Sequence, residues 1–286
     1  MRSLLFIPGH DERKLEKGLG CGADALILDL EDAVPMDGKA RARDITAAFV
    51  GQHHAQHRLF VRINDLDSDM ALQDLAAVVR AQPYGIMLPK CSGTDELVRV
   101  GAWLEALEVR EGIAPGTIRI LPIVTEHARA VLNMGEYTHS ANSRLCGMLW
   151  GGEDLATDIG ARSNQDAPDH YTDVFRLARS MTLLAAASAR VTPVDAVYVN
   201  FRNPEGLRAE ALDARRDGFT AKAAIHPDQV AVINEVFQPA EQELEWARRV
   251  VSAFAQSPGA GSIGLDGKML DRPHLLAAQR LLDGMN

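Results

Sequence analysis

The chain has 286 residues, 47% of them hydrophobic and 24% charged, which is enough apolar material for one large α/β domain or two small ones. Its formal net charge of -9 argues against general binding to nucleic acids or anionic membranes. Three widely spaced cysteines without a CxxC pair argue against a zinc site or a disulfide framework. No stretch resembles a signal peptide or a membrane span, so we expect a cytoplasmic protein.

Short apolar runs alternate with segments of helical periodicity along most of the chain. The runs predict eight strands, over residues 3–9, 25–32, 58–65, 84–90, 119–126, 144–154, 195–200 and 219–227. The segments between them predict helices that include 69–82, 94–109, 127–134, 171–190 and 206–217. This alternation is typical of parallel βαβ units, and eight units within roughly 230 residues favour a (β/α)₈ TIM barrel over an open sheet.

The C-terminal part of the chain predicts further helices. Helical periodicity covers 227–237 and 240–255, and a Gly-rich turn at 259–270 precedes a last helix at 272–282. We expect residues 1–237 to form the barrel and residues 238–286 to form a C-terminal helical extension. Asp271 precedes Arg272 and Pro273, so its simplest role is that of N-cap for the last helix.

Polar side chains stand at the ends of seven of the eight predicted strands. They are Glu31 with Asp32, Arg62 with Asn64, Lys90, Glu126, Glu153 with Asp154, Asn200, and His226. In a barrel the carboxyl ends of the strands converge on one face, and that face holds the chemistry. The sequence therefore predicts a functional site at this end of the barrel.

Two carboxylates are candidate metal ligands. Glu126 ends the run LPIVTE, and Asp154 follows the Gly-Gly exit of the next run. Neighbouring strands that each end in an acid can direct oxygen atoms at one Mg²⁺, and the absence of nearby Cys or His clusters favours such a hard cation. The alternative is that both are exposed loop carboxylates, and Glu153 competes with Asp154 as the ligand.

Arg62 lies inside a strand, where a charged side chain is costly to bury unless it is paired. It forms either a structural ion pair with Glu31 or Asp32, or a site for the oxygens of a carboxylate, thioester or enolate. Glu31 and Asp32 are secondary candidates that could hold metal-bound water or orient Arg62, or they are solvated acids. Lys90 is a further secondary candidate, whose simplest role is that of an ion-pair partner at the barrel mouth. His226 is expected to be a packed, hydrogen-bonded histidine.

The sequence resembles the citrate lyase β-subunit-like branch of the HpcH/HpaI aldolase superfamily, nearly from end to end. The resemblance is carried by LLFIPG (4–9), LILDLEDAV (26–34), VRIN (61–64), GIMLPK (85–90), LPIVTE (121–126), MLWGGEDL (148–155), IHPDQV (225–230) and GKMLDRPHLLAAQ (267–279). Thr125 is a local departure, because relatives often carry an aliphatic residue there.

The resemblance implies a (β/α)₈ catalytic barrel with Mg²⁺ ligands at Glu126 and Asp154 and a substrate-binding arginine at Arg62. It also implies that the C-terminal extension packs on a neighbouring subunit and brings Asp271 to the partner's active site. A homotrimer or hexamer is therefore expected, and neither nucleic acid nor membrane is expected as a partner.

The expected activity is that of a Mg²⁺-dependent carbon–carbon lyase. It would cleave a 3-hydroxyacyl-CoA thioester of the malyl-, citramalyl- or citryl-CoA type to a 2-oxo acid and an acyl-CoA, through an enolate. Arg62 would stabilise the enolate oxygen and Asp271 would transfer the proton at the enolate carbon. The alternatives are an aldolase for free hydroxy-oxo acids, thioester hydrolysis after condensation, and a non-autonomous citrate lyase β-type subunit that acts on an acyl-carrier-protein thioester.

Overall fold

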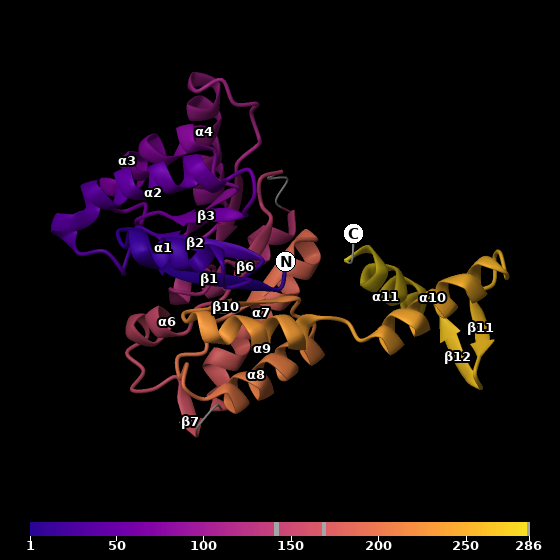
Figure 1. Cartoon of the computed structure of the whole chain (residues 1–286). Coiled ribbons are helices and arrows are strands. Elements are labelled where there is room, and N and C mark those ends of the chain that lie inside the picture. The colour runs from indigo at the N-terminus through magenta and orange to yellow at the C-terminus, as the bar shows by residue number, and fades with distance from the viewer. Residues whose placement is uncertain (140–142, 168–169, 285–286) are drawn as a thin grey trace. The chain divides into compact units, whose positions relative to one another are not determined.

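The first part of the chain is built on eight parallel strands (Figure 1). The structure is a computed structural model that describes residues 1–139, 143–167 and 170–284. The strands are β1 (Ser3–Pro8), β2 (Ala25–Asp29), β3 (Leu59–Arg62), β4 (Gly85–Leu88), β5 (Arg119–Pro122), β6 (Gly147–Leu149), β9 (Thr192–Asp195) and β10 (Ala221–Ala224). They are hydrogen-bonded in the order β5-β4-β3-β2-β1-β10-β9-β6.

Hydrogen bonds between β5 and β6, the first and last strands of this order, close the sheet into a barrel. The Ile120 N–H donates to the Arg144 carbonyl (2.8 Å), the Cys146 N–H donates to the Ile120 carbonyl (3.0 Å), and the Val124 N–H donates to the Leu149 carbonyl (2.9 Å). Parallel bridges pair Ile120 with Leu145 and Ile123 with Leu149. The predicted (β/α)₈ TIM barrel is confirmed.

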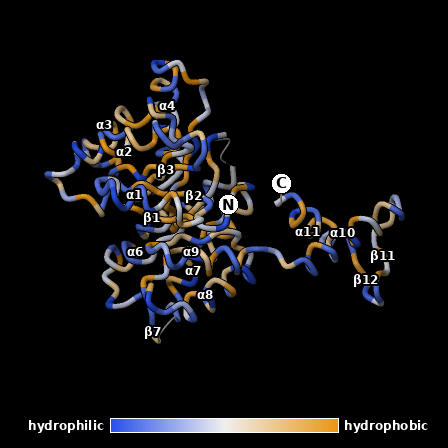
Figure 2. The backbone as a smooth tube through the Cα atoms, viewed as in Figure 1, coloured by the Kyte–Doolittle hydropathy of each residue, from blue (hydrophilic) through white to orange (hydrophobic). Residues whose placement is uncertain are grey.

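The helices of this unit surround the strands (Figure 1). They are α1 (Glu12–Leu19), α2 (Lys39–His53), α3 (Met70–Val78), α4 (Thr94–Arg110), α5 (Ala128–Leu132), α6 (Glu153–Asp158), α7 (Asp173–Ala189), α8 (Pro204–Asp217) and α9 (Pro227–Phe237). Figure 2 shows hydrophobic residues concentrated along the central strands. Leu4, Ile27, Phe60, Met87 and Leu121 belong to one buried cluster of strand residues, and a larger cluster joins the strands to the helices.

The prediction for the seventh strand was wrong, because β9 spans Thr192–Asp195 rather than residues 195–200. Pro193 lacks an N–H but lies inside the strand, and its carbonyl accepts a hydrogen bond from the Thr220 N–H (3.3 Å). The apolar run that suggested a later strand continues beyond the sheet, because Ala196 and Val197 line a cavity.

The second compact unit comprises residues 238–286, of which the last two lie outside the described residues. It contains α10 (Glu241–Ala255), α11 (Arg272–Asp283) and an antiparallel hairpin of β11 (Ser262–Leu265) and β12 (Lys268–Asp271). The sequence predicted only a turn over 259–270. Asp266 and Gly267 both have positive φ (51° and 73°), as a two-residue Asp-Gly hairpin turn requires.

A second short hairpin, β7 (Gln165–Ala167) with β8 (His170–Tyr171), lies between α6 and α7 and was also missed. None of the helices within the described residues combines the length and apolar character needed to cross a membrane.

A buried ion pair fixes the seam between β5 and β6. Glu108 of α4 accepts two hydrogen bonds from the Arg144 guanidinium (2.8 and 2.6 Å) and one each from the backbone N–H groups of Gly116 and Ile118 (both 2.8 Å). Neither the Glu108 nor the Arg144 side chain is more than 8% exposed. Because the Arg144 carbonyl also accepts the Ile120 N–H, this pair holds the segment that closes the barrel.

We expect Glu108→Ala to lower the free energy of unfolding by about 3–5 kcal/mol, because a buried guanidinium would lose its counter-charge. Urea unfolding followed by circular dichroism measures the change. The control Glu105→Ala, at an exposed position of the same helix, should cost less than about 0.5 kcal/mol. A loss for Glu108→Ala no larger than that of the control would show that the seam does not depend on the pair.

Candidate active site

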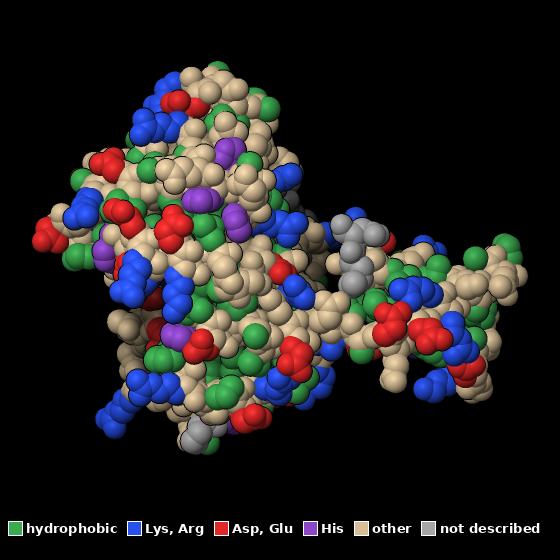
Figure 3. All heavy atoms as spheres, viewed as in Figure 1, with side chains coloured by type: hydrophobic (Ala, Val, Ile, Leu, Met, Phe, Trp, Pro, Cys, Tyr) green, Lys and Arg blue, Asp and Glu red, His purple; other side chains and the backbone are tan. Residues whose placement is uncertain are grey.

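A cavity of about 480 Å³ opens at the carboxyl ends of the barrel strands. Arg62 at the end of β3, Glu126 after β5 and Asp154 after β6 all line it, and so does Asp32 after β2. On the left of Figure 3, Lys, Arg and His side chains surround a hollow in which acidic side chains are visible. The three residues on which the sequence hypothesis depends therefore lie around one cavity.

Arg62 is held by Asp29, a residue that the sequence reasoning missed. Arg62 Nε donates to Asp29 Oδ1 and Nη2 donates to Oδ2, both at 2.7 Å, which is a bidentate ion pair. Asp29 and Arg62 are register partners on adjacent strands, so two opposite charges in buried neighbouring runs were the available signal. Burial alone would raise the pKa of Asp29, but the Arg62 guanidinium holds it below its usual value.

Of the two ion-pair partners predicted for Arg62, Glu31 is close and buried, whereas Asp32 is more distant and exposed. Glu31 Oε2 lies 3.1 Å from Arg62 Nη1 and its side chain is 6% exposed, whereas Asp32 lies 3.9 Å away and is 62% exposed. Phe6 covers the guanidinium, whose carbon is 5.0 Å from the ring centroid. Arg62 is thus fixed in place on several sides before any substrate arrives.

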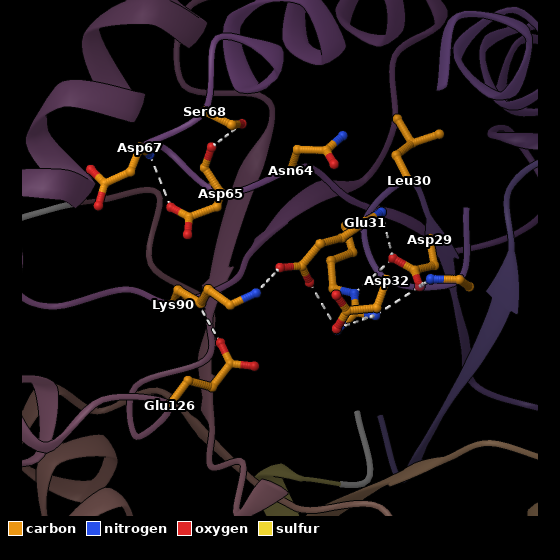
Figure 4. Close-up of polar contacts among 12 residues, drawn as sticks. Asp29, Leu30, Glu31, Asp32, Asn64, Asp65, Asp67, Ser68, Lys90 and Glu126 are labelled. Atoms are coloured by element: carbon orange, nitrogen blue, oxygen red, sulfur yellow. Dashed lines mark hydrogen bonds and ion pairs between the residues drawn. The ribbon is translucent and has the colours of Figure 1, made fainter. Parts of the chain in front are cut away.

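Lys90 connects this cluster to Glu126. Its ammonium forms an ion pair with Glu31, and its backbone N–H donates to Glu126, as Figure 4 shows. Lys90 adopts a left-handed backbone conformation (φ 51°), which is strained for a residue with a side chain. The strain lets one residue direct its N–H at one carboxylate and its ammonium at another.

A buried lysine fixes the loop that carries Glu31. Lys39 Nζ donates to the carbonyls of Leu30 (2.7 Å) and Glu31 (2.6 Å) and to Asn64 Oδ1 (2.6 Å). Asn64 in turn donates through its backbone and side-chain amides to Asp74 (2.8 and 2.7 Å). This network ties the ends of β2 and β3 to helices α2 and α3, and the sequence gave no pattern from which to derive it.

Glu126 and Asp154 are brought together by Thr125. The Thr125 hydroxyl donates to the Gly151 carbonyl and accepts from the Gly151 N–H, both at 2.8 Å, so the ends of β5 and β6 are joined. A Cβ at Gly151 would lie 3.4 Å from Glu126 Cγ and 3.3 Å from a methyl carbon of Ile123, so the close approach favours glycine. Thr125 therefore joins the strand ends that carry the two candidate ligands.

Glu126 is 3% exposed. Burial, together with the charges of Glu31 and Asp154, raises the pKa of Glu126 to about 8, against the opposing effect of the Lys90 N–H. A divalent cation would reduce the repulsion between a buried carboxylate and the carboxylates around it.

The donor set suits Mg²⁺. In the part of the chain that the structure describes, no group of three or more His, Cys, Asp or Glu side chains is arranged to hold a metal. Mg²⁺ usually keeps several water ligands and uses one or two carboxylates, a role that Glu126 and Asp154 can fill. Glu153, the competing candidate, is an exposed residue that accepts a hydrogen bond from Asn164 (2.7 Å).

The remaining wall of the cavity is mostly apolar. Trp150 is fully buried, donates through its indole N–H to Asp195 (2.7 Å), and meets the edge of Tyr171 with ring centroids 5.1 Å apart. Val197 and Ile225 continue this wall. One side of the cavity is thus charged and the other accommodates carbon chains.

Asp271 belongs to the second unit. It ends β12 and is the N-cap residue of α11, as the sequence predicted, and its carboxylate lies 2.6 Å from His274 Nδ1. Its carboxylate is 41% exposed within this unit.

A TIM barrel that gathers two carboxylates and a fixed guanidinium around a cavity at its strand ends is an enzyme that handles oxygen-rich, anionic substrates. The sequence profile of the HpcH/HpaI aldolase/citrate lyase family matches residues 2–227, and this chain belongs to that family. The resemblance inferred from the motifs is confirmed.

Individual relatives are similar along most of their length. The (3S)-malyl-CoA thioesterase of Cereibacter sphaeroides (strain KD131) is 38% identical over 284 residues, covering 98% of this chain and 93% of the relative. The mitochondrial citramalyl-CoA lyase of Mus musculus is 32% identical over 296 residues, covering 98% and 85%. The crystal structure of CitE from Mycobacterium tuberculosis in complex with magnesium, acetoacetate and coenzyme A has a TM-score of 0.77 at 32% identity, covering 99% and 97%.

We expect the stability of the metal-free protein, relative to Glu126→Gln, to fall as the pH rises from about 5 to about 8. The unfolded chain releases this proton near 4.5, whereas native Glu126 retains it until about 8, so proton release favours unfolding over this window. The loss should approach roughly 1 kcal/mol per pH unit in urea titrations with EDTA. Parallel pH profiles for the two proteins would contradict the raised pKa.

Proposed function

We propose that this protein is a Mg²⁺-dependent carbon–carbon lyase that cleaves a 3-hydroxyacyl-CoA thioester of the malyl-, citramalyl- or citryl-CoA type. The products are a 2-oxo acid and an acyl-CoA. The observation that carries the proposal is the presence of Arg62, Glu126 and Asp154 around one cavity at the ends of β3, β5 and β6. Relatives that act on malyl-CoA and citramalyl-CoA, and a similar structure that contains magnesium and coenzyme A, support it.

Glu126 and Asp154 hold the cation. A magnesium ion held by these two residues would supply Lewis-acid chemistry for the oxygens of the hydroxy acid. Glu126 must be ionised to bind it, and the Lys90 N–H favours that form. Asp32, exposed at the cavity wall, is placed to accept hydrogen bonds from water at the mouth.

Arg62 stabilises the oxygen of the acyl-CoA enolate, on which negative charge develops as the carbon–carbon bond breaks. The bidentate contact with Asp29 and the ion pair with Glu31 hold the guanidinium in one orientation, so little reorganisation is needed during the reaction. A single preorganised donor of this kind typically contributes about 3–4 kcal/mol to the rate. The apolar wall at Trp150 and Val197 excludes water from the enolate.

Asp271 transfers the proton at the enolate carbon. We propose that it does so in the active site of a neighbouring subunit, which requires a homo-oligomer, a trimer or a hexamer, in the cytoplasm. The exposed position of the Asp271 carboxylate, which is 41% exposed, supports this assignment.

Thioester hydrolysis is a second candidate reaction, because a relative 38% identical to this chain is named a (3S)-malyl-CoA thioesterase. Water would then attack the thioester carbonyl, CoA would leave as the thiolate, and the carbon–carbon bond would stay intact. The products would be a hydroxy diacid and free CoA. Product analysis separates the two reactions, since only the lyase releases a 2-oxo acid.

We expect Asp154→Ala to lower Mg²⁺-dependent release of 2-oxo acid by at least about a thousandfold while the protein stays folded, because one of two ligands is lost. A panel of CoA thioesters assayed with Mg²⁺ or with EDTA measures this. Glu153→Gln is the matched control at the neighbouring acid and should retain activity. An active, EDTA-insensitive Asp154→Ala protein would contradict the metal assignment.

A mixing experiment tests the role of Asp271. Arg62→Lys and Asp271→Asn should each be inactive, the first because an ammonium does not replace the planar guanidinium. Asn is as good an N-cap as Asp, so Asp271→Asn removes the acid and keeps α11.

When the two variants are co-expressed in equal amounts, we expect about a quarter of wild-type activity, because random assembly pairs an intact barrel with an intact Asp271 in that share of sites. Co-assembled protein without restored activity would show that Asp271 does not act across subunits. Full activity of Asp271→Asn alone would remove it from the mechanism.

A further inference from the structure

A cluster of charged side chains is buried between the barrel strands and helices α7 and α8. It consists of Arg179 of α7, Asp195 of β9, Glu210 of α8 and Lys222 of β10. The Asp195 and Lys222 side chains are 1% and 0% exposed, and that of Glu210 is 8% exposed. Burial of charges is costly even when they are paired. None of the four residues has a role in the proposed reaction.

Lys222 lies at the centre of this cluster. Its ammonium donates to Asp195 Oδ2 (2.7 Å), to Glu210 Oε1 (2.6 Å) and to the Ala196 carbonyl (2.8 Å), which uses all three of its N–H groups. Asp195 and Lys222 are also register partners on adjacent strands. Because Ala196 lines the cavity, Lys222 fixes the backbone where the chain leaves β9 and enters the cavity wall.

Asp195 holds the indole ring of Trp150. Asp195 Oδ1 accepts hydrogen bonds from Trp150 Nε1 (2.7 Å) and from Arg179 Nε (2.9 Å). Burial alone would raise the pKa of Asp195, but the charges of Lys222 and Arg179 hold it below its usual value. The indole N–H therefore donates to an ionised carboxylate, which is a stronger hydrogen bond than one between neutral groups.

Trp150 is also enclosed by its other neighbours. A Cβ at Gly152 would lie 3.2 Å from Trp150 Cζ3 and 3.7 Å from Phe175 Cδ1, so the glycine lets the indole pack closely against the backbone. The edge of Trp150 meets Tyr171, with ring centroids 5.1 Å apart. Trp150 is fully buried, whereas Tyr171 is partly exposed and lines the cavity. Trp150 therefore supports Tyr171 and limits its movement away from the cavity.

These contacts fix one side of the cavity, the inner wall, which we define as Trp150, Tyr171, Ala196 and Val197. We propose that Asp195, held by Lys222, is a positioning residue that keeps the inner wall rigid and so excludes acyl groups with an additional methyl branch. This inference rests on the proposed function, because it assumes that the acyl chain of a CoA thioester lies against the inner wall. A closely packed wall anchored by buried ion pairs does not retreat to make room for a methyl group.

The test compares two CoA thioesters that yield the same 2-oxo acid but release either acetyl-CoA or propionyl-CoA. We expect the wild-type kcat/KM to be about a hundredfold higher for the thioester that releases acetyl-CoA, as a tight pocket can achieve against one added carbon. Asp195→Asn should reduce this ratio about tenfold, because an amide has one acceptor oxygen for the three donors that contact Asp195.

Trp150→Phe tests the same contact while Asp195 keeps both of its cationic partners. It should also reduce the ratio about tenfold. The double variant should show the same tenfold reduction rather than a hundredfold one, because Asp195 acts through Trp150. Glu108→Gln is the matched control, since it weakens a different buried ion pair, next to the amino ends of β5 and β6. It should lower the stability and leave the ratio unchanged.

A second measurement does not depend on activity. In the Trp103→Phe/Trp246→Phe protein, Trp150 is the only tryptophan. Introducing Asp195→Asn into this protein should lower the fluorescence anisotropy of Trp150, because the indole gains local freedom.

A wild type without a preference, or a ratio that Asp195→Asn and Trp150→Phe leave unchanged, would overturn the inference. Additive effects of these two substitutions, an equal effect of Glu108→Gln, or an unchanged Trp150 anisotropy would also overturn it. A wild type that releases no 2-oxo acid from any CoA thioester would instead contradict the proposed function. Lower Trp150 anisotropy in such a protein would still support Asp195 as the residue that positions Trp150.

Discussion

The bidentate ion pair between Arg62 and Asp29 is the interaction on which the candidate site depends. A guanidinium inside a barrel strand would be strongly unfavourable without a partner, and Asp29 supplies it from the adjacent strand. The pair also leaves a fixed cation at the cavity, around which Glu31 and Lys90 are arranged. The ion pair with Asp29 therefore compensates the cost of burying the guanidinium and also holds Arg62 in the position that the proposed chemistry needs.

Charge balance links this pair to the metal. Around the cavity, carboxylates outnumber Arg62 and Lys90, and burial together with the charges of Glu31 and Asp154 raises the pKa of Glu126. Proton uptake relieves the excess charge in the absence of a cation, whereas a divalent cation relieves it by direct coordination. Thr125 joins the ends of β5 and β6 through Gly151, so the proposed ligands Glu126 and Asp154 lie on two strand ends that are tied together.

The fold and the positions of the site residues could be predicted from the sequence because each strand is an apolar run and a polar residue marks its end. Buried parallel strands are continuous apolar runs, and polar residues such as Arg62 and Lys90 mark where they end. Asp29 could not be singled out in this way, since it lies within a run rather than after it. The network of Lys39, Asn64 and Asp74 depends on contacts between distant segments, which periodicity does not encode. The end of β9 was misplaced because residues that line a cavity are as apolar as those of a sheet.

The most direct test of the central claim is the position of a bound cation. Anomalous diffraction from crystals soaked with Mn²⁺ and a 2-oxo acid should locate one ion, with carboxylate oxygens of both Glu126 and Asp154 at about 2.1 Å and the acid between the ion and Arg62. An ion bound elsewhere at the mouth, or bound without either of these two carboxylates, would contradict the account.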